Sequence, residues 1–405
     1  MASLKAGEQR LVWTTFTSEQ IDIGVERAEG QAYLNAIDLS MTQAGAFHYA
    51  TMAAIALAGV LLGHLADSLG RKNTIILGLA IFALNSYLFA VGNSFAFFLT
   101  LLTISGAAIG IFKTGALALI GDISRSTREH TSTMNAVEGF FGVGAIVGPA
   151  IVGALLARGV SWKWLYVIAG TLCVVLIVIA LFVEYPRTSR PASEAVDLRR
   201  TLGMMRNRYA LAFSLGAFLY VAVECAVYVW MPTLLAGYQG RGASLAPYAI
   251  SVFFVLRAGG RFVGAWMLAK YEWTTVTALF SLAILACFAG SVGGGVSAAA
   301  VLLPLSGLFM SIVYPPLNSK GISCFAKSQH GAVAGVILFF SCAAAALGPL
   351  AMGAVSDAFG HARYGFVLAT AFAALLHLGL LLHWIYDPAR AMLQRLDRSE
   401  YDVQA

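Results

Sequence analysis

Long hydrophobic runs of about 20 residues recur along the chain from residue 44 to residue 386, separated by short polar turns. A run of that length spans the hydrocarbon core of a bilayer when it is helical. Because no water is available inside a bilayer, each run has to satisfy its own backbone hydrogen bonds, which a helix does. The pattern predicts eleven spanning helices at residues 44–66, 74–92, 95–121, 134–157, 163–184, 209–235, 246–270, 273–293, 297–322, 330–356 and 361–386.

The segment before the first run, residues 12–34, breaks this pattern because it carries several acids spaced three or four residues apart, namely Glu19, Asp22, Glu26 and Glu29. Each acid at the bilayer centre costs roughly 2–3 kcal/mol on insertion scales. The spacing nevertheless places all of them on one face of a helix. Three interpretations stay open: a polar segment outside the bilayer, a spanning helix whose acids face a wet cavity, or a protein with only eleven spanning helices.

The composition agrees with a membrane protein, because 59% of the residues are hydrophobic and only 11% are charged. A soluble protein of 405 residues could not cover its surface with so few charges. The five cysteines lie singly, four inside predicted spans and Cys324 two residues beyond one, which favours packing thiols over disulfides or a metal site. We expect an all-α, multi-pass protein of a plasma membrane, the inner membrane of a bacterium, that is monomeric and needs no cofactor.

The net charge is +6, and the basic residues are concentrated in the loops on one side of the predicted membrane topology. Only Arg158, Lys163, Arg241 and Arg363 fall in loops on the sparsely charged side. By the positive-inside rule the richer side is cytoplasmic, and no aromatic-interleaved basic patch remains for a nucleic-acid partner. The cytoplasmic set is Arg71, Lys72, Arg125, Arg128, Arg187, Arg190, Arg199, Arg200, Arg206, Arg208, Lys270, Lys327, Arg390, Arg395 and Arg398.

The turn between the first two runs reads Gly-His-Leu-Ala-Asp-Ser-Leu-Gly-Arg-Lys over residues 63–72. It resembles the signature between helices 2 and 3 of the major facilitator superfamily, G-x-x-x-D-R-x-G-R-[RK], with Ser68 as the one departure. The resemblance implies that Asp67 engages charges or a helix N-terminus across the bundle, as part of an inner gate. The residues with this gating or structural role are Gly63, Asp67, Gly70, Arg71 and Lys72.

An internal repeat supports two homologous halves. Gly148-Pro149 recurs as Gly348-Pro349, and both Ser105-Gly106 and Gly63 have counterparts at an offset of 200 or 201 residues. Gly148 and Pro149 also permit close approach and bending of the fifth helix. The superfamily resemblance implies six helices per half, with the substrate site between the halves. The predicted parts are 1–43 (polar segment or helix 1), 44–184 (first bundle), 185–208 (cytoplasmic linker), 209–386 (second bundle) and 387–405 (cytoplasmic tail).

Glu224 is the leading candidate for proton coupling, because it lies in the middle of the span 209–235. A carboxyl is costly to bury in a bilayer and is a functional hypothesis by default. Tyr220 and Tyr228 lie one helical turn to either side and are candidate substrate contacts. The alternative role for Glu224 is a structural ion pair with Arg257 or Arg261.

Other charged residues inside spans extend this candidate site. The forked guanidinium of Arg257 suits a carboxylate, a phosphate or sugar hydroxyls, whereas Arg261 is nearer the cytoplasm and is predicted to be structural. Three roles stay open for Lys113: it binds an anionic substrate, it carries a proton if burial lowers its pKa, or it extends toward the cytoplasm. Glu138 is a second candidate for proton coupling; its alternative role is a partner at the cytoplasmic edge for Arg125, Arg128 or Lys113.

The tenth predicted span contains Tyr314-Pro315-Pro316, followed one turn later by Asn318. Broken helices line transporter cavities, so Tyr314 and Asn318 are candidate substrate contacts. A simple kink without a functional role is the alternative.

Two stretches resemble helices 7 and 8 of the fucose/glucose–proton symporter family: residues 218–233, with Glu224 and Trp230-Met-Pro-Thr, and Gly260-Arg261-Phe-Val-Gly264. The resemblance implies a sugar-like substrate and proton coupling. Lys113 and the two arginines would also suit an organic anion. We therefore expect a secondary transporter of a small polar solute that works by alternating access and couples to protons.

Two other functions remain open. Gly144-x-x-x-Gly148-Pro149 resembles part of a drug–proton antiporter signature and would fit efflux. The polar N-terminal segment would fit a receptor or assembly factor that does not transport. An enzyme is not expected, since the sequence shows no nucleophile–base pair or metal-ligand spacing.

Overall fold

The computed structural model describes residues 41–91, 94–161, 163–185, 198–235, 238–240, 246 and 248–401, and these residues form helices without strands. The segment 12–34, with its three open interpretations, lies outside the described residues. The helices are α4 (Met41–Leu62), α5 (Leu65–Ser68), α6 (Arg71–Phe89), α7 (Phe95–Ile123), α8 (Thr127–Ala157), α9 (Trp164–Phe182), α10 (Leu198–Met204), α11 (Arg208–Cys225), η2 (Ala226–Trp230), α12 (Met231–Leu235), α13 (Ala249–Lys270), α14 (Trp273–Ser323), η4 (Lys327–Gln329), α15 (His330–Ala358), α16 (Arg363–Tyr386), α17 (Arg390–Leu396) and η5 (Asp397–Tyr401).

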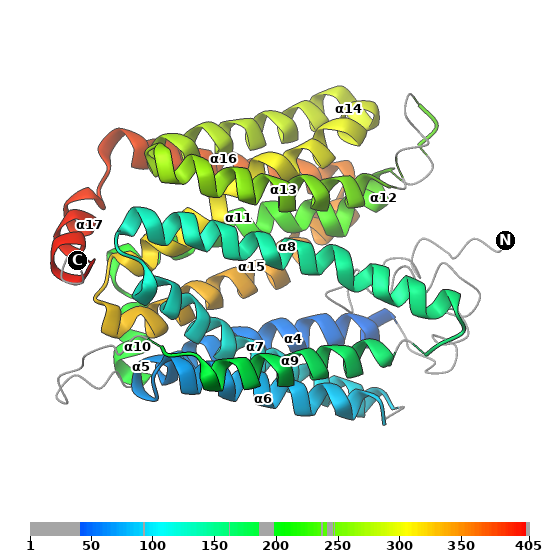
Figure 1. The fold of residues 1–405 in the computed structure, drawn as a ribbon. Helices are drawn as coiled ribbons and strands as arrows, with labels where there is room; N and C mark the ends of the chain where they lie inside the picture. Colours follow the sequence, from blue (N-terminus) through cyan, green and yellow to red (C-terminus); the bar gives the residue numbers. More distant parts are fainter. Residues whose placement is uncertain are drawn as a thin grey trace.

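The predicted spans are found in the described part of the chain. Nine helical stretches there are long and apolar enough to cross a membrane. One of them, α14, consists of two arms, because Gly295 adopts φ 72° and reverses the chain direction. The long helix α8 runs beside these stretches (Figure 1). Each of the eleven predicted segments therefore coincides, within a few residues, with a helix, a helical stretch or one arm of α14.

The helices form a bundle in which the early and late parts of the chain lie on opposite sides (Figure 1). Helices α4, α6, α7 and α9 lie on one side, and α11, α13, α14 and α16 lie on the other. Helices α8 and α15 lie between them, with α8 packed along α13 and α15 along α4. We call α4–α9 the first half and α11–α16 the second half. The end of the bundle that carries α5, α10 and α17 has most of the basic residues, and we call it the cytoplasmic end, as the positive-inside rule predicts.

Glycines bring α4 and α15 into backbone contact near the cytoplasmic end. A Cβ atom on Gly335 would overlap the carbonyl oxygen of Gly59, and one on Gly63 would lie 3.0 Å from the carbonyl oxygen of Gly331. Small residues permit such close packing because no side chain separates the two helices. This crossing joins the first half to the second half.

The fifth predicted span shows the same use of small residues. Gly142 of α8 faces Ala258 of α13, and a Cβ atom on the glycine would lie 3.0 Å from the alanine Cβ. Gly148 is buried, and α8 continues as a helix through Gly148 and Pro149. The contact between α8 and α13 is the second one that joins the halves, and it too has little side-chain volume between the two helices.

Two segments contain short helices that the sequence did not predict. The predicted linker 185–208 contains the helix α10, and the predicted tail 387–405 contains α17 and η5, whose Leu393 and Tyr401 side chains are buried. Helices of five to seven residues span too few turns for a hydrophobic periodicity to show in the sequence.

Gly335→Ala should destabilise the protein, because the added methyl group meets the carbonyl oxygen of Gly59 and forces α15 away from α4. We expect the free energy of unfolding to fall by about 1–3 kcal/mol. Thermal unfolding of the purified variant measures this change. Gly379→Ala in α16 is the matched control, because its Cβ would meet nothing within 4 Å. Equal unfolding temperatures for the two variants would contradict the backbone contact.

Candidate functional site

Five charged side chains from four helices meet between the two halves. They are Lys113 of α7, Glu138 of α8, Glu224 of α11, and Arg257 and Arg261 of α13. We call them the central charge cluster. Four of the five side chains are largely buried, whereas that of Lys113 is 28% exposed.

Glu224 forms an ion pair inside the second half. Its Oε1 atom lies 2.6 Å from Nε of Arg257. The hydroxyl group of Tyr220 lies 2.7 Å from the same oxygen and 2.9 Å from the carbonyl oxygen of Met310, so it donates to one of the two. The structural role predicted for Glu224 is therefore present, with Arg257 as the partner. Protonation of the Glu224 carboxylate would neutralise it and remove its charge-assisted attraction to Arg257.

Glu138 forms the pair that bridges the two halves. Its Oε2 atom accepts a hydrogen bond of 2.9 Å from Arg261, and its Oε1 atom lies 4.0 Å from Nζ of Lys113. Of the partners that the sequence suggested for Glu138, only Lys113 is correct. Arg128 instead pairs with Glu272, because α8 turns its first-turn side chains toward the end of α13 and the start of α14.

The two pairs form one continuous site, because Arg257 and Arg261 lie one helical turn apart on α13. The cluster contains three cationic groups and two carboxylates, which leaves one positive charge in excess. Arg261 was predicted to be structural. It is 1% exposed and holds Glu138 of the opposite half, which makes it part of the cluster rather than a peripheral residue.

Aromatic side chains extend the cluster in both halves. The rings of Tyr220 and Tyr314 lie 5.5 Å apart, and the hydroxyl groups of Tyr314 and Ser341 are 3.2 Å apart. A cation–ring contact of 5.5 Å joins Lys113 to Phe141. The interface between the halves therefore offers hydroxyl groups and rings beside charges.

Two predicted contacts make no hydrogen bond to the cluster among the described residues. The Tyr228 hydroxyl is 2.7 Å from Sγ of Cys225, and the Tyr228 ring packs near Phe254. Tyr228 lies in the π-helix η2, whose wider turn differs from the α-helical period on which the prediction rested. Asn318 is 1% exposed and, among the described residues, its Oδ1 atom has no hydrogen-bond partner.

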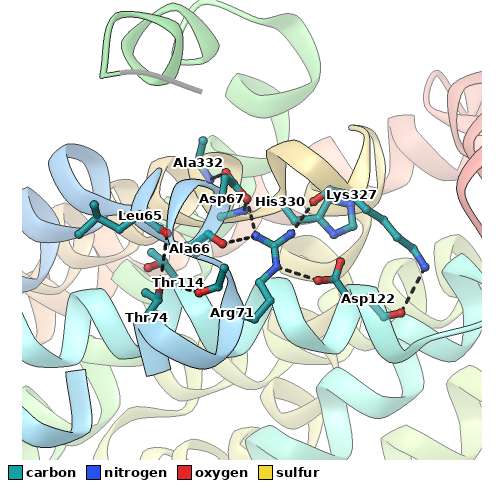
Figure 2. Close-up of polar contacts among 12 residues, drawn as sticks. Leu65, Ala66, Asp67, Arg71, Thr74, Thr114, Asp122, Lys327, His330 and Ala332 are labelled. Carbon is teal, nitrogen blue, oxygen red and sulfur yellow. Dashed lines mark hydrogen bonds and ion pairs between the residues drawn. The ribbon is translucent and has the colours of Figure 1, made fainter. Parts of the chain in front are cut away.

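The motif at residues 63–72 forms a second site at the cytoplasmic end (Figure 2). The carboxylate of Asp67 accepts hydrogen bonds from the backbone amides of Gly331 (3.0 Å) and Ala332 (2.8 Å). These amides belong to the first turn of α15, where the helix dipole favours a negative charge. The helix N-terminus expected for Asp67 is therefore that of α15, in the second half.

Arg71 completes this contact. Its guanidinium donates to Asp67 (2.5 Å), to Asp122 of α7 (2.8 Å) and to the carbonyl oxygen of Lys327 (2.6 Å), and the Lys327 ammonium group donates to the carbonyl oxygen of Asp122 (3.3 Å). We call Asp67, Arg71, Asp122, Lys327 and the first turn of α15 the cytoplasmic latch (Figure 2). Asp122 and Lys327 were not predicted, although a charge at the end of an apolar run is a visible signal for each.

The remaining motif residues shape the turn. Gly70 has φ 85°, a conformation that favours glycine, and it precedes the first residue of α6. Lys72 donates to the carbonyl oxygens of Leu181 and Val183 at the end of α9, at 2.9 and 3.1 Å. Lys72 therefore fixes the cytoplasmic end of the first half, whereas Arg71 joins the two halves.

Comparisons with known sequences indicate one family. The sequence model of the Major Facilitator Superfamily matches residues 28–349. Protein TsgA of Shigella flexneri is 25% identical over 232 residues, 56% of this chain and 57% of that protein. Quinolone resistance protein NorA of Staphylococcus aureus is 32% identical over 119 residues, 29% of this chain and 30% of that protein. The matched regions thus span less than two thirds of either relative.

Solved structures share the fold over nearly the whole chain. FucP in its outward conformation, described as the fucose:proton symporter of E. coli, matches with a TM-score of 0.77 and 20% identity, covering 93% of this chain and 97% of that one. The human organic anion transporter MFSD10 matches with a TM-score of 0.68 and 18% identity, covering 92% and 99%. Such identities show a common fold and no more. Because the family match covers most of the chain, including the motif at residues 63–72, this protein belongs to the Major Facilitator Superfamily of membrane transporters.

Proposed function

We propose that this transporter moves a small polar organic solute, a sugar or an organic anion, together with protons by alternating access. The observation that carries the proposal is the central charge cluster, in which three cations and two carboxylates meet between the halves. Alternating access places the substrate site at this interface, where each half supplies part of the contacts. The fold shared with FucP and MFSD10 is compatible with both substrate classes.

The excess positive charge favours a solute with an anionic group. The ammonium group of Lys113 is the most accessible member of the cluster and lies 4.0 Å from Glu138. Arg257 presents a guanidinium that can hold a carboxylate or neighbouring hydroxyls through paired hydrogen bonds. Tyr220 and Tyr314 supply rings and hydroxyls beside it. A solute bound here would exchange its hydration shell for these groups.

Proton coupling would act through the two carboxylates. Protonation of Glu224 removes its attraction to Arg257, which is then available to the solute. Protonation of Glu138 weakens the only pair within the cluster that joins the two halves, Glu138–Arg261. Each event changes the relative free energies of the inward-facing and outward-facing states, which is the requirement for coupling.

The cytoplasmic latch supports a structure that is closed toward the cytoplasm. Asp67 and Arg71 of the first half hold the first turn of α15 and the carbonyl oxygen of Lys327 in the second half. Opening toward the cytoplasm would have to break these contacts. The likeness to FucP in an outward conformation fits the same state.

Drug efflux by proton antiport is the second candidate. The sequence match to a quinolone resistance protein favours it. A planar aromatic drug would use apolar and aromatic contacts more than the charge cluster. A thermal-shift screen of monosaccharides, sugar acids, short carboxylic acids and fluoroquinolones separates the candidates, because only a bound solute stabilises the folded protein. Stabilisation by fluoroquinolones alone would overturn the first proposal.

Glu224→Gln should abolish proton-driven accumulation of the solute selected by that screen. The amide is isosteric but cannot take up a proton, so a pH gradient no longer biases the two states. Uptake into proteoliposomes under an imposed pH gradient measures the loss. Solute exchange without a gradient is the internal control, and we expect it to persist.

Full gradient-driven accumulation by Glu224→Gln would exclude Glu224 as the coupling residue. The same experiment on Glu138→Gln would then decide whether the other carboxylate carries the proton. Loss of exchange as well as accumulation would assign Glu224 to solute binding instead.

Lys113→Gln should weaken transport of an anionic solute by raising its KM roughly tenfold or more, the range for losing a hydrogen bond to a charged group. A neutral analogue of the same solute should be little affected. Competition uptake in proteoliposomes measures both. Lys270→Gln, which removes an exposed cation at the end of α13, is the matched control. Equal losses for charged and neutral analogues would contradict a charge-recognition role.

A further inference from the structure

The end of the chain folds back beneath the cytoplasmic end of the bundle. After α16 ends at Tyr386, the left-handed conformation of Asp387 (φ 37°) turns the chain into α17 and η5 (Figure 1). We call residues 390–401 the C-terminal strap. Neither the central charge cluster nor the cytoplasmic latch, as defined above, contains any residue of the strap.

The strap contacts the first half at the start of α8. The Asp397 carboxylate accepts a hydrogen bond of 2.8 Å from the backbone amide of Thr127 and one of 3.2 Å from its hydroxyl group. Thr127 is the first residue of α8, so Asp397 places a negative charge at a helix N-terminus of the opposite half. The strap thereby supplies an N-terminal cap that comes from 270 residues away in the sequence.

The strap contacts the second half through its last described residues. Glu400 accepts a hydrogen bond of 3.2 Å from the backbone amide of Lys327. The Lys327 ammonium group lies 4.4 Å from the centre of the Tyr401 ring, within the range of a cation–π contact. Lys327 also belongs to the cytoplasmic latch, so the strap and the latch share one residue.

Tyr401 lies in the seam between the halves and is 1% exposed. Its hydroxyl group is 3.2 Å from the Ser323 hydroxyl at the end of α14 and 3.3 Å from Nδ1 of His130 in α8. Ser323 and His130 are themselves 2.8 Å apart. The three side chains therefore form a closed polar triangle with one corner in each half and one in the strap.

The inner face of the strap is only partly packed. A cavity of about 540 Å³ separates it from the helix ends, and its lining includes Arg390 and Gln394 of the strap and Lys320 across from them. Among the apolar side chains of the strap, Leu393 and Tyr401 are the buried ones. The strap is therefore held by the buried Leu393 side chain and by the polar contacts of Asp397, Glu400 and Tyr401, and opening of the seam has to break these contacts.

We propose that the C-terminal strap is an intramolecular brake that holds the cytoplasmic side closed, and that Tyr401 must leave the seam before the transporter opens inward. The contacts of Asp397 and Tyr401 exist only while the start of α8 and the end of α14 lie side by side. They therefore stabilise the closed state relative to the open one, whichever solute is carried. This proposal is independent of the substrate and of the coupling ion.

Cys324 provides a native reporter for the test. It lies at the end of α14 and is 4% exposed, and burial raises the pKa of its thiol to about 12. Maleimides react with the thiolate, so this cysteine reacts slowly while the seam is closed and faster when opening hydrates it. The labelling rate follows the population of the open state when opening and closing are fast.

Inside-out membrane vesicles that contain the full-length protein are treated with a membrane-impermeant maleimide, and modification of Cys324 is followed by mass spectrometry. We expect Tyr401→Phe and Asp397→Ala each to raise the labelling rate roughly threefold to tenfold, the range for losing one or two hydrogen bonds. The double variant should exceed either single variant. Ser399→Ala, an exposed strap residue, is the matched control and should label at the native rate.

Cys287 distinguishes opening from unfolding, because it is 5% exposed within the first arm of α14, which contributes no residue to the central charge cluster. Inward opening should label Cys324 and leave Cys287 unmodified, whereas unfolding exposes both. Deletion of residues 390–405 removes the whole strap. If this deletion unfolds the protein and exposes both cysteines, the comparison rests on the point variants Tyr401→Phe and Asp397→Ala. A native labelling rate for Cys324 in the double variant, or a slower one, would overturn the proposal.

Discussion

A charge buried in the membrane part of a protein has to be compensated by another polar group, and this constraint organises the whole molecule. Removing one partner of a buried pair costs about 3–5 kcal/mol, because the remaining charge stays desolvated. Here the partners come from different helices: Glu138 and Arg261 from opposite halves, and Asp67 with the first turn of α15. The same contacts that compensate the charges therefore fix how the halves meet.

These contacts lie in the central charge cluster and at the cytoplasmic end of the bundle. They respond differently when the two halves move relative to each other. The glycine crossing of α4 and α15 lies next to the latch, so a shift of α15 acts on both at once. The Glu224–Arg257 pair lies within the second half and can survive a rigid rotation of the halves. The Glu138–Arg261 pair joins the halves and has to adapt. Helix α11, which carries Glu224, packs on α15, whose first turn belongs to the latch, so the central cluster and the latch are linked by one helix contact.

The sequence predicted the spanning helices, because runs of apolar residues have one stable form in a bilayer. The resemblance of the motif implied charges or a helix N-terminus as partners of Asp67, and Asp67 contacts both, Arg71 and the first turn of α15. The sequence did not predict that Glu138 pairs with Arg261, since that contact depends on how α8 crosses α13. It did not show the π-helix around Tyr228, because a single wide turn leaves no separate hydrophobic period in the sequence. Asp397 and Tyr401 gave no signal, because short helices have little periodicity and their partners lie far away in the sequence.

The free energy of the contacts that hold the cytoplasmic end closed limits how the transporter can open. Shifting a two-state equilibrium from 1:99 to 99:1 takes about 5.5 kcal/mol of differential binding. Several charge-assisted hydrogen bonds of roughly 1.5–3 kcal/mol each in the latch would together exceed that amount if they were lost without replacement. Asp67, Arg71 and Lys327 lie at the cytoplasmic end, where water can replace the contacts as they break. Opening is therefore an exchange of partners whose net free energy is small, and a few contacts from the C-terminal strap are enough to tip the balance between the two states.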